Sequence, residues 1–219
     1  MAMDMDDEAR LRAAFAAPEP PRGNEPPGAS GVLIPIFEVG GEPHLLFTRR
    51  ALTLSSHPGE ISFPGGRVDP GDGGPRDAAL REAEEETGIR PADVTVLGHL
   101  TDYMTFRGTL VCAYVGLVEG DPPREPASPL EVADILVVPV RDLLREDVYE
   151  GRTLPDGPRE GVVHYWHLPQ GVIWGITGEL VARFLRRTHG WEPPRPPRVI
   201  HHLSEFIPER DGTSPDSRA

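Results

Sequence analysis

Three glutamates on one face of a predicted helix are the residues of this sequence best placed to do chemistry. Glu82, Glu85 and Glu86 stand at positions i, i+3 and i+4 of a helix predicted over residues 75–87, so their carboxylates share one side. Like charges at this spacing repel one another, and only Arg81 is near enough to offset them. A solvated acidic face usually alternates with basic residues. Because this face does not, the pattern favours a cation-binding site.

A double glycine just before the helix supplies a further oxygen donor. Gly65 and Gly66 follow Phe-Pro, and two glycines in a row let the backbone come close to a neighbouring group. A carbonyl of Gly66, or of Gly65, makes an all-oxygen site together with the three carboxylates. Mg²⁺ or Mn²⁺ suits such a site, where the ion usually keeps several waters and bridges to substrate phosphates. We therefore expect Mg²⁺- or Mn²⁺-dependent chemistry on a phosphate compound.

The charge of the chain narrows the class of partner. The formal net charge is −13, which argues against nucleic acid because such binding needs a basic surface. A phosphate substrate remains compatible, since a bound cation inverts the local field. The sequence contains no lysine, which is typical of GC-rich coding and a bacterial source, so direct phosphate contacts fall to arginine. Arg49 and Arg67, with Arg50 beside them, flank the glutamate segment and are the expected substrate-binding residues.

The remaining composition points to a protein of the cytoplasm. No apolar run approaches the roughly 20 residues that a membrane helix needs, so no membrane partner is expected. The N-terminus, MAMDMDDEAR, is acidic and lacks the basic and apolar segments of a secretory signal. The single cysteine, Cys112, lies in an apolar run and is expected to be a core residue. A homodimer is a possible assembly.

The order of apolar runs and turn signals predicts one domain with tails. Its length of 219 residues fits this organisation. The predicted strands are residues 31–37, 44–50, 94–101, 109–118, 134–140 and 161–168, and the predicted helices are 8–17, 75–87 and 175–188. Strands dominate, so we expect an α+β fold in which helices cover a mixed sheet. We divide the chain into an N-terminal helix and Pro-rich connector (1–30), a central domain (31–189) and a Pro-rich, loosely ordered tail (190–219).

Residues 64–89 resemble the Nudix box, whose pattern is G-x5-E-x7-R-E-U-x-E-E-x-G-U, with U an aliphatic residue. The run from Arg81 to Ile89 matches the whole second half of this pattern. The first half departs, because the first acid falls on Asp72 and one extra residue precedes Arg81. We expect the loop at 71–75 to absorb this residue. The departure affects the role of Asp72 but leaves the three glutamates of the box in place.

The same departure resembles the coenzyme A diphosphatase branch of the Nudix family. The stretch 45–66 resembles the coenzyme A signature of that branch and ends in the same Phe-Pro-Gly-Gly. Residues 173–177 resemble a C-terminal element of the branch. One position differs, since serine occupies position 55, where the signature has arginine. The resemblance spans roughly residues 31–188.

The resemblance implies a Nudix-type α/β/α sandwich with a mixed sheet and a site on the glutamate helix. Glu82, Glu85, Glu86 and the Gly66 carbonyl would hold the metal, and Arg81 would orient the carboxylates. Apart from the resemblance, Phe106 lies between two predicted strands, where a loop could reach the site and stack the ring on adenine, and core packing is its alternative role. The position of the general base varies in this family, and the candidates here are Glu85, Glu125 and Glu131.

Three functions remain open at this stage. The first is hydrolysis of the pyrophosphate bond of coenzyme A and its derivatives to 3′,5′-ADP and 4′-phosphopantetheine species. The second is hydrolysis of ADP-ribose, NADH or a dinucleotide, which Ser55 in place of the signature arginine keeps open. The third is a non-catalytic Nudix module that binds nucleotides. Such modules usually lack one of the metal glutamates, and all three are present here.

Overall fold

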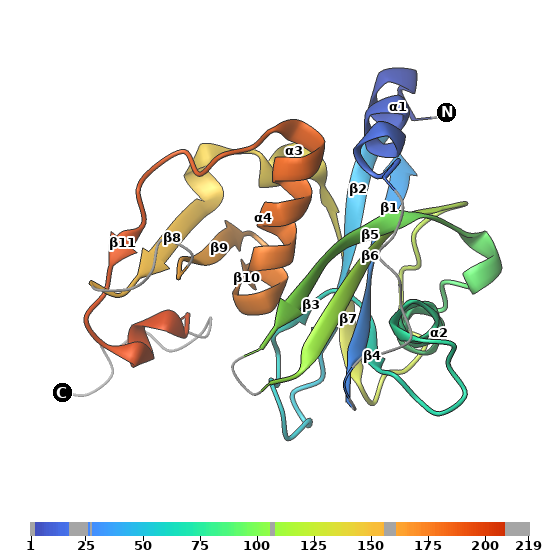
Figure 1. The fold of residues 1–219 in the computed structure, drawn as a ribbon, viewed down its shortest axis with the longest axis horizontal. Helices are drawn as coiled ribbons and strands as arrows, with labels where there is room; N and C mark the ends of the chain where they lie inside the picture. The colour runs from blue at the N-terminus through green and yellow to red at the C-terminus, as the bar shows by residue number, and fades with distance from the viewer. Residues whose placement is uncertain (1–2, 18–25, 27, 106–107, 156–160, 209–219) are drawn as a thin grey trace.

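The computed structural model describes residues 3–17, 26, 28–105, 108–155 and 161–208, which build two β-sheets and four α-helices (Figure 1). The larger sheet contains β1 (Ser30–Val39), β2 (Glu42–Arg50), β3 (Ile61–Ser62), β4 (Gly65–Arg67), β5 (Val94–Met104), β6 (Leu110–Val118) and β7 (Val132–Pro139). The smaller sheet contains β8 (Tyr149–Thr153), β9 (Val163–Leu168), β10 (Gly171–Ile173) and β11 (Arg198–Val199). The α-helices are α1 (Met5–Ala14), α2 (Pro75–Thr87), α3 (Val140–Leu143) and α4 (Gly175–His189). None of the described helices is long and apolar enough to cross a membrane.

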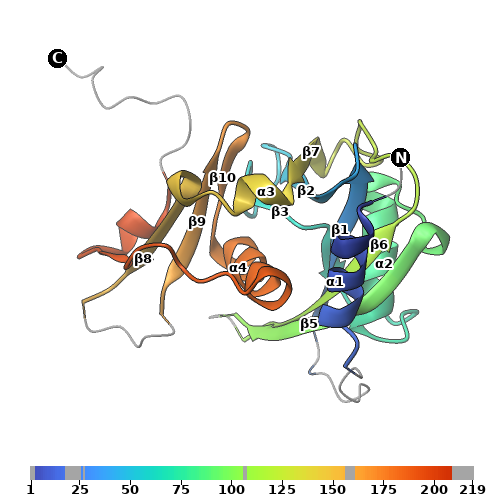
Figure 2. The same cartoon turned by 90° about the horizontal axis from the view of Figure 1, so that it is seen from above.

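The larger sheet is mixed and carries helices on both faces. β1 and β6 run parallel, whereas every other described pair in this sheet is antiparallel. Helix α2 packs on one face against β1 and β6, and α4 with α1 lies on the other (Figure 2). The predicted α+β sandwich around a mixed sheet is confirmed.

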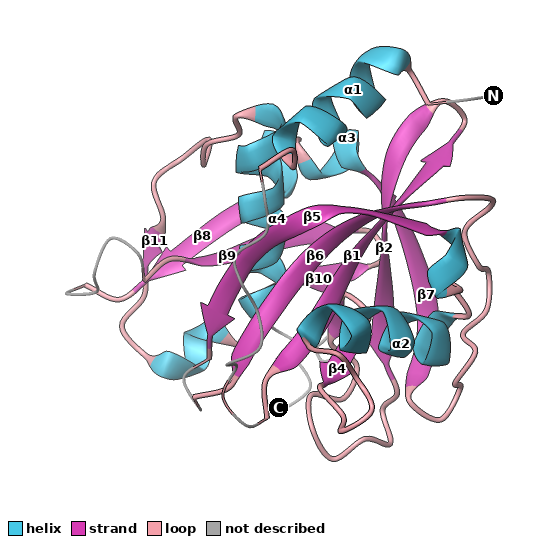
Figure 3. Ribbon diagram, turned by 45° about the vertical axis from the view of Figure 1, so that its right-hand side comes forward, coloured by secondary structure: helices cyan, strands magenta, loops and turns pink. Residues whose placement is uncertain are grey.

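Strands β3 and β4 enter the sheet where β1 and β2 separate. β1 pairs directly with β2 only between Ile36 and Val39, while the start of β1 pairs with β4 and the end of β2 pairs with β3. Phe63 and Pro64 connect β3 to β4, which begins with Gly65 and Gly66, and the Leu33 amide donates a hydrogen bond to the Pro64 carbonyl at 3.0 Å. The sheet thus places this turn beside α2 (Figure 3).

Helix α2 has the start and the end that its sequence predicts. Pro75 occupies the first turn, and Gly88 ends the helix in the left-handed conformation with φ of 80°. Small residues form its buried face, where Ala79 and Ala83 pack on Leu33 and other residues of β1 and β6. Because alanines bring the helix axis close to the sheet, the adjacent face with Glu82 and Glu86 lies just above β4.

The smaller sheet rests on α4 and is closed by residues 190–208, which we expected to be loosely ordered. Trp191 and Ile200 are buried, and the Ile200 amide donates to the Thr153 carbonyl at 2.8 Å. The Tyr165 hydroxyl donates to the Phe206 carbonyl from the same sheet. A few apolar residues of this segment thus reach a core that the sequence pattern did not show. Strand β8 was also missing from the prediction.

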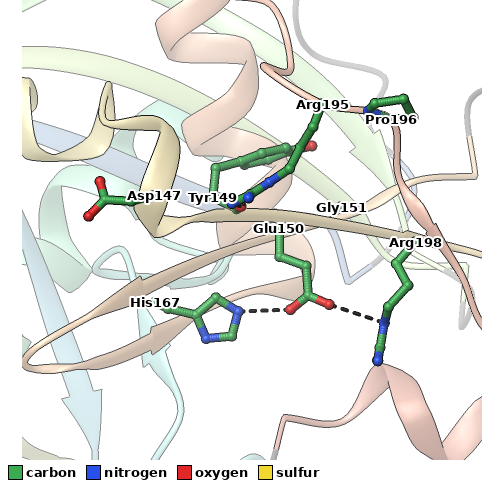
Figure 4. A pocket seen from close by; sticks show the side chains of 8 residues that line it. All are labelled: Asp147, Tyr149, Glu150, Gly151, His167, Arg195, Pro196 and Arg198. Atoms are coloured by element: carbon green, nitrogen blue, oxygen red, sulfur yellow. Dashed lines mark hydrogen bonds and ion pairs between the residues drawn. The ribbon is translucent and has the colours of Figure 1, made fainter.

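An ion-pair cluster fixes this segment to β8. The Glu150 carboxylate accepts hydrogen bonds from Arg152. It also accepts one from His167 and pairs with Arg198 of β11, beside a pocket of about 330 Å³ (Figure 4). The hydrogen bond from Arg152, followed by that from His167, lowers the pKa of Glu150 to about 2, although burial acts in the opposite direction. We interpret the cluster as structural, since each side of the carboxylate already has a basic partner.

His164 is a buried neutral base in the core of the smaller sheet. Burial lowers its pKa to about 4, and the charges of Arg186 and Arg183 act in the same direction. The Glu179 carboxylate lies 3.5 Å from His164 Nε2 and would favour the charged ring. Glu179 is itself paired with Arg183 at 2.6 Å, so its field at the ring is largely cancelled and burial prevails.

We expect the free energy of unfolding to fall by about 3 kcal/mol between pH 6.5 and pH 4 because of His164. Above pH 6.5 the ring is neutral in both states, and below it the unfolded chain takes up a proton that the folded protein does not. Urea unfolding of the wild type and of His164→Gln across this pH range measures the contribution of His164 to the free energy of unfolding. His189, whose pKa burial also lowers, is present in both proteins and cancels. If the free energy of unfolding changed with pH in the same way in both proteins, the prediction would be wrong.

Candidate active site

The three glutamates of α2 lie on one side of the helix and differ in burial. Glu86 is buried with 6% of its surface exposed, Glu82 is half-buried, and Glu85 extends into solvent with 59% of its side chain exposed. Glu86 Oε2 is buried without a hydrogen-bond partner among the described residues. A buried carboxylate oxygen in this state costs free energy, so the position favours a bound cation.

Burial and mutual repulsion disfavour the ionised forms of two of these carboxylates. Burial, followed by the charge of Glu82, raises the pKa of Glu86 to about 8, although Arg50 acts in the opposite direction. Burial also raises the pKa of Glu82, despite its hydrogen bond from Arg81. Neighbouring carboxylates perturbed in this way are typical of functional sites. A divalent cation beside them would favour both ionised forms.

The double glycine forms the floor beneath these carboxylates. A Cβ atom on Gly66 would overlap the Glu82 carboxylate, and one on Gly65 would overlap the backbone of β1. The Gly65 amide donates a hydrogen bond to the Glu86 carboxylate. Only glycine at both positions lets β4 reach the glutamate face, which explains the physical need for this pair.

Arg81 holds the carboxylates in place rather than pointing at an open space. Its Nη1 donates to Glu82 at 3.0 Å and to Glu85 at 3.2 Å. Its Nε and Nη2 both bond the Asp72 carboxylate at 3.1 Å, and Nη2 also donates to the Arg67 carbonyl at 2.9 Å. The planar guanidinium thus joins α2, β4 and the preceding loop. This geometry supports the orienting role expected for Arg81.

Asp72 is the buried end of this network. Only 7% of its side chain is exposed, and the hydrogen bond from Arg81 lowers its pKa, with a further contribution from the Asp69 amide. The extra residue of the segment is absorbed in the loop before α2, where the Asp72 amide donates to the Asp69 carbonyl at 3.0 Å. The shorter acid therefore reaches Arg81 from the loop.

The loop before β7 brings a fourth carboxylate toward the site. The Ala127 amide donates to the Glu86 carbonyl at 3.0 Å, and the Ala51 amide donates to the Glu131 carbonyl at 2.8 Å. The negative charge of Glu131 contributes to the raised pKa of both Glu82 and Glu86, which places it near them. Glu125, in the same loop, is exposed.

Comparison with known proteins agrees with this geometry. Residues 28–157 match the NUDIX domain. This chain belongs to the Nudix family. Two relatives indicate the branch of the family that it resembles, and a solved structure has a similar fold.

NudL of Photorhabdus laumondii, named as an uncharacterized Nudix hydrolase, is 39% identical over 173 residues, which cover 78% of this chain and 90% of that protein. Peroxisomal coenzyme A diphosphatase NUDT7 of Mus musculus is 36% identical over 157 residues, covering 69% of this chain and 66% of the mouse protein. A MutT/nudix family protein from Enterococcus faecalis superimposes with a TM-score of 0.51 at 13% identity, over 85% of this chain and 75% of that one. The predicted resemblance to the coenzyme A diphosphatase branch and the predicted class, a Nudix pyrophosphohydrolase, are confirmed.

The arginines expected to bind substrate do not all lie at the Nudix helix. Arg49 donates to the Gln170 carbonyl in the turn between β9 and β10, so its guanidinium links the two sheets. Successive residues of a strand point to opposite faces of the sheet, so Arg50 points away from Arg49, and Arg50 is the one whose charge acts on Glu86. Strand periodicity alone does not say which of the two faces α2. The Arg67 side chain is exposed beside the site.

Phe106, the expected adenine-stacking residue, lies outside the described residues. Its role therefore stays a prediction. The last residue of β5 and the first residues of β6 lie at the same end of the sheet as β4. Met104 pairs with Leu110, Val111 pairs with Ser30, and Ser30 pairs with Arg67 of β4.

The residues of the Nudix helix fit a hard divalent cation. They provide an orphaned buried oxygen on Glu86, a second carboxylate on Glu82 and the Gly65–Gly66 backbone at contact distance. Within the described parts of the chain, no three acidic, histidine or cysteine side chains come close enough together to hold a metal ion by themselves. Mg²⁺ characteristically uses one or two carboxylates and keeps waters for substrate phosphates, so an open face of this kind is the expected form.

Proposed function

We propose that this protein hydrolyses the pyrophosphate bond of coenzyme A and its derivatives, giving 3′,5′-ADP and 4′-phosphopantetheine species, with Mg²⁺ or Mn²⁺. The observation that supports hydrolysis most strongly is the glutamate face of α2, complete and held by Arg81 over Gly65 and Gly66. The substrate proposal rests on the branch resemblance and on the similarity to a mouse coenzyme A diphosphatase.

The chain's own residues suggest how the reaction proceeds. A water molecule attacks one phosphorus, the bridging P–O bond breaks, and the other phosphate leaves with the bond electrons. When bound, the divalent cation would acidify water and neutralise charge on the phosphate oxygens. Glu131, which lies near Glu82 and Glu86 but outside the Arg81 network, is our candidate for the base that accepts the proton of the water. Glu85 already accepts a hydrogen bond from Arg81, which makes it the weaker candidate for this base.

Arg50 is our candidate for the phosphate-binding residue. Its backbone is fixed on both sides, because its amide donates to the Glu60 carbonyl at 2.9 Å and its carbonyl accepts from the Gly59 amide at 3.1 Å. Its Nε donates to the Ser56 carbonyl at 3.3 Å, so the guanidinium is held near Glu86 with donors to spare. Arg67 and Phe106 remain proposed substrate contacts from the sequence.

The residue at position 55 supports a second candidate substrate class, ADP-ribose and related dinucleotides. Ser55 is exposed in the loop between β2 and β3, where the branch signature has an arginine. The 3′-phosphate of coenzyme A carries roughly two negative charges near neutral pH, so losing one guanidinium weakens its recognition. We therefore expect coenzyme A to be preferred, with modest discrimination against its 3′-dephospho form.

Comparison of kcat/KM for coenzyme A, 3′-dephospho-coenzyme A and ADP-ribose, with Mg²⁺ and with Mn²⁺, tests the proposal. Coenzyme A is expected to have the highest value. Ser55→Arg should raise the preference for coenzyme A over the dephospho form by about 10- to 100-fold, the equivalent of one charge-assisted contact. Thr53→Arg, exposed in the same loop, is the matched control and should change it little. A clear preference of the wild type for ADP-ribose would overturn the assignment in favour of the second class.

A further inference from the structure

A second pocket lies on the far side of the molecule from the Nudix helix. It has a volume of about 550 Å³ and is formed by α4, strands β8 and β9, and the segment that follows α4. None of its lining residues belongs to α2, β3 or β4. Its size is within the range of small-molecule sites, and prolines 193 and 197 stiffen its rim.

A buried imidazole nitrogen forms part of its wall. His164 is only 4% exposed, and its Nδ1 lies 2.7 Å from the Tyr149 hydroxyl. Burial raises the pKa of Tyr149 to about 12, so this hydroxyl stays protonated and can donate to Nδ1. His164 Nε2 then carries the ring proton and has neighbours only at 3.5 Å, in Arg186 and Glu179. Those distances exceed the usual 2.7–3.2 Å of an N–H···O bond, so this donor is poorly satisfied.

One of the two arginines that line the pocket lacks a carboxylate partner among the described residues. Arg183 pairs with Glu179 at 2.6 Å and donates to the Thr101 hydroxyl, so these two charges cancel. Arg186 has no carboxylate partner among the described residues and stands 5.6 Å over the Trp191 ring. Glu192, the remaining acid of the lining, is exposed at the rim, where water screens it.

We propose that this pocket binds a small oxyanion, such as the phosphate group of a metabolite, between the Arg186 guanidinium and His164 Nε2. The two nitrogens are 3.5 Å apart, so one phosphate oxygen can accept from both, and the planar guanidinium has further donors for a second oxygen. Such a ligand would neutralise the unpaired cation and satisfy the buried donor together. The site is separate from the proposed catalytic function and does not depend on it.

Thermal unfolding with inorganic phosphate, in protein stripped of divalent ions, tests the site. A ligand that binds the folded state raises Tm in a saturable way, and sodium chloride at equal ionic strength controls for screening. We expect this rise in the wild type and in Glu82→Gln, which impairs only the Nudix face. We expect it to disappear in Arg186→Gln and to persist in Arg12→Gln, an exposed arginine of α1.

A second measurement keeps the test decisive if Arg186→Gln folds poorly. In the wild type, phosphate should shift the imidazole nitrogen signals of His164 in a ¹⁵N spectrum, with the same midpoint as the rise in Tm. Arg186→Lys, which keeps the charge and loses the planar fork, should weaken the midpoint at least several-fold. No Tm response of the wild type beyond that to chloride, or an unshifted His164 signal, would overturn the proposal.

Discussion

Replacement of Glu86 by glutamine is expected to lower kcat by more than about 100-fold, since loss of even an outer-shell partner of a metal typically costs up to that factor. Glutamine has nearly the same shape but removes the charge that a divalent cation requires. Glu86 already lies buried with an unpartnered oxygen, so the fold itself gains nothing from that charge. The variant should therefore unfold at the same or a higher temperature than the wild type when no metal is present.

The control for this prediction lies on the same helix. Glu84 is exposed and away from the site, and Glu84→Gln should keep both turnover and the stabilisation by Mg²⁺ or Mn²⁺. Glu82→Gln should behave like Glu86→Gln, with a lost or weakened rise of Tm on adding the metal. If both glutamine variants at the Nudix face turned over at the rate of the wild type, the metal site would have to lie elsewhere.

Replacement of Arg81 by glutamine is expected to reduce both activity and stability. Its guanidinium orients the carboxylates of Glu82 and Glu85, so we expect a loss of roughly 10- to 100-fold in kcat, the range for residues that position metal ligands. It is also the partner of the buried Asp72, and leaving that carboxylate unpaired should cost about 2–3 kcal/mol of unfolding free energy. Arg81→Lys should restore neither activity nor stability fully, because one ammonium group cannot reach Asp72, Glu82 and Glu85 together.

A double substitution separates the two effects of Arg81. Adding Asp72→Asn to Arg81→Gln removes the orphaned charge, so urea unfolding should show most of the stability restored. Turnover should stay low, because the metal carboxylates still lack their positioning residue. If activity returned together with stability, Arg81 would act only through the fold and its proposed role at the site would be wrong.

Much of the candidate site was readable in the sequence because its pattern is local. The start of α2 at Pro75 and its end at Gly88 follow from short-range backbone preferences. The shared face of Glu82 and Glu86 follows from the helical period alone. The resemblance to the Nudix family could be recognised from the sequence because its strong motifs lie in one continuous segment, residues 60–89.

The tertiary structure decided which of these groups meet. Arg49 and Arg50 are neighbours on β2 and point to opposite faces of the sheet, and only the tertiary structure shows that Arg49 meets the smaller sheet while Arg50 lies near Glu86. Asp72 joins Arg81 from a loop whose course depends on the insertion of β3 and β4 between β1 and β2. Trp191, which follows α4, packs into a core formed by strands far away in sequence. Such contacts depend on strand pairing over long separations, for which local propensity and periodicity carry no signal.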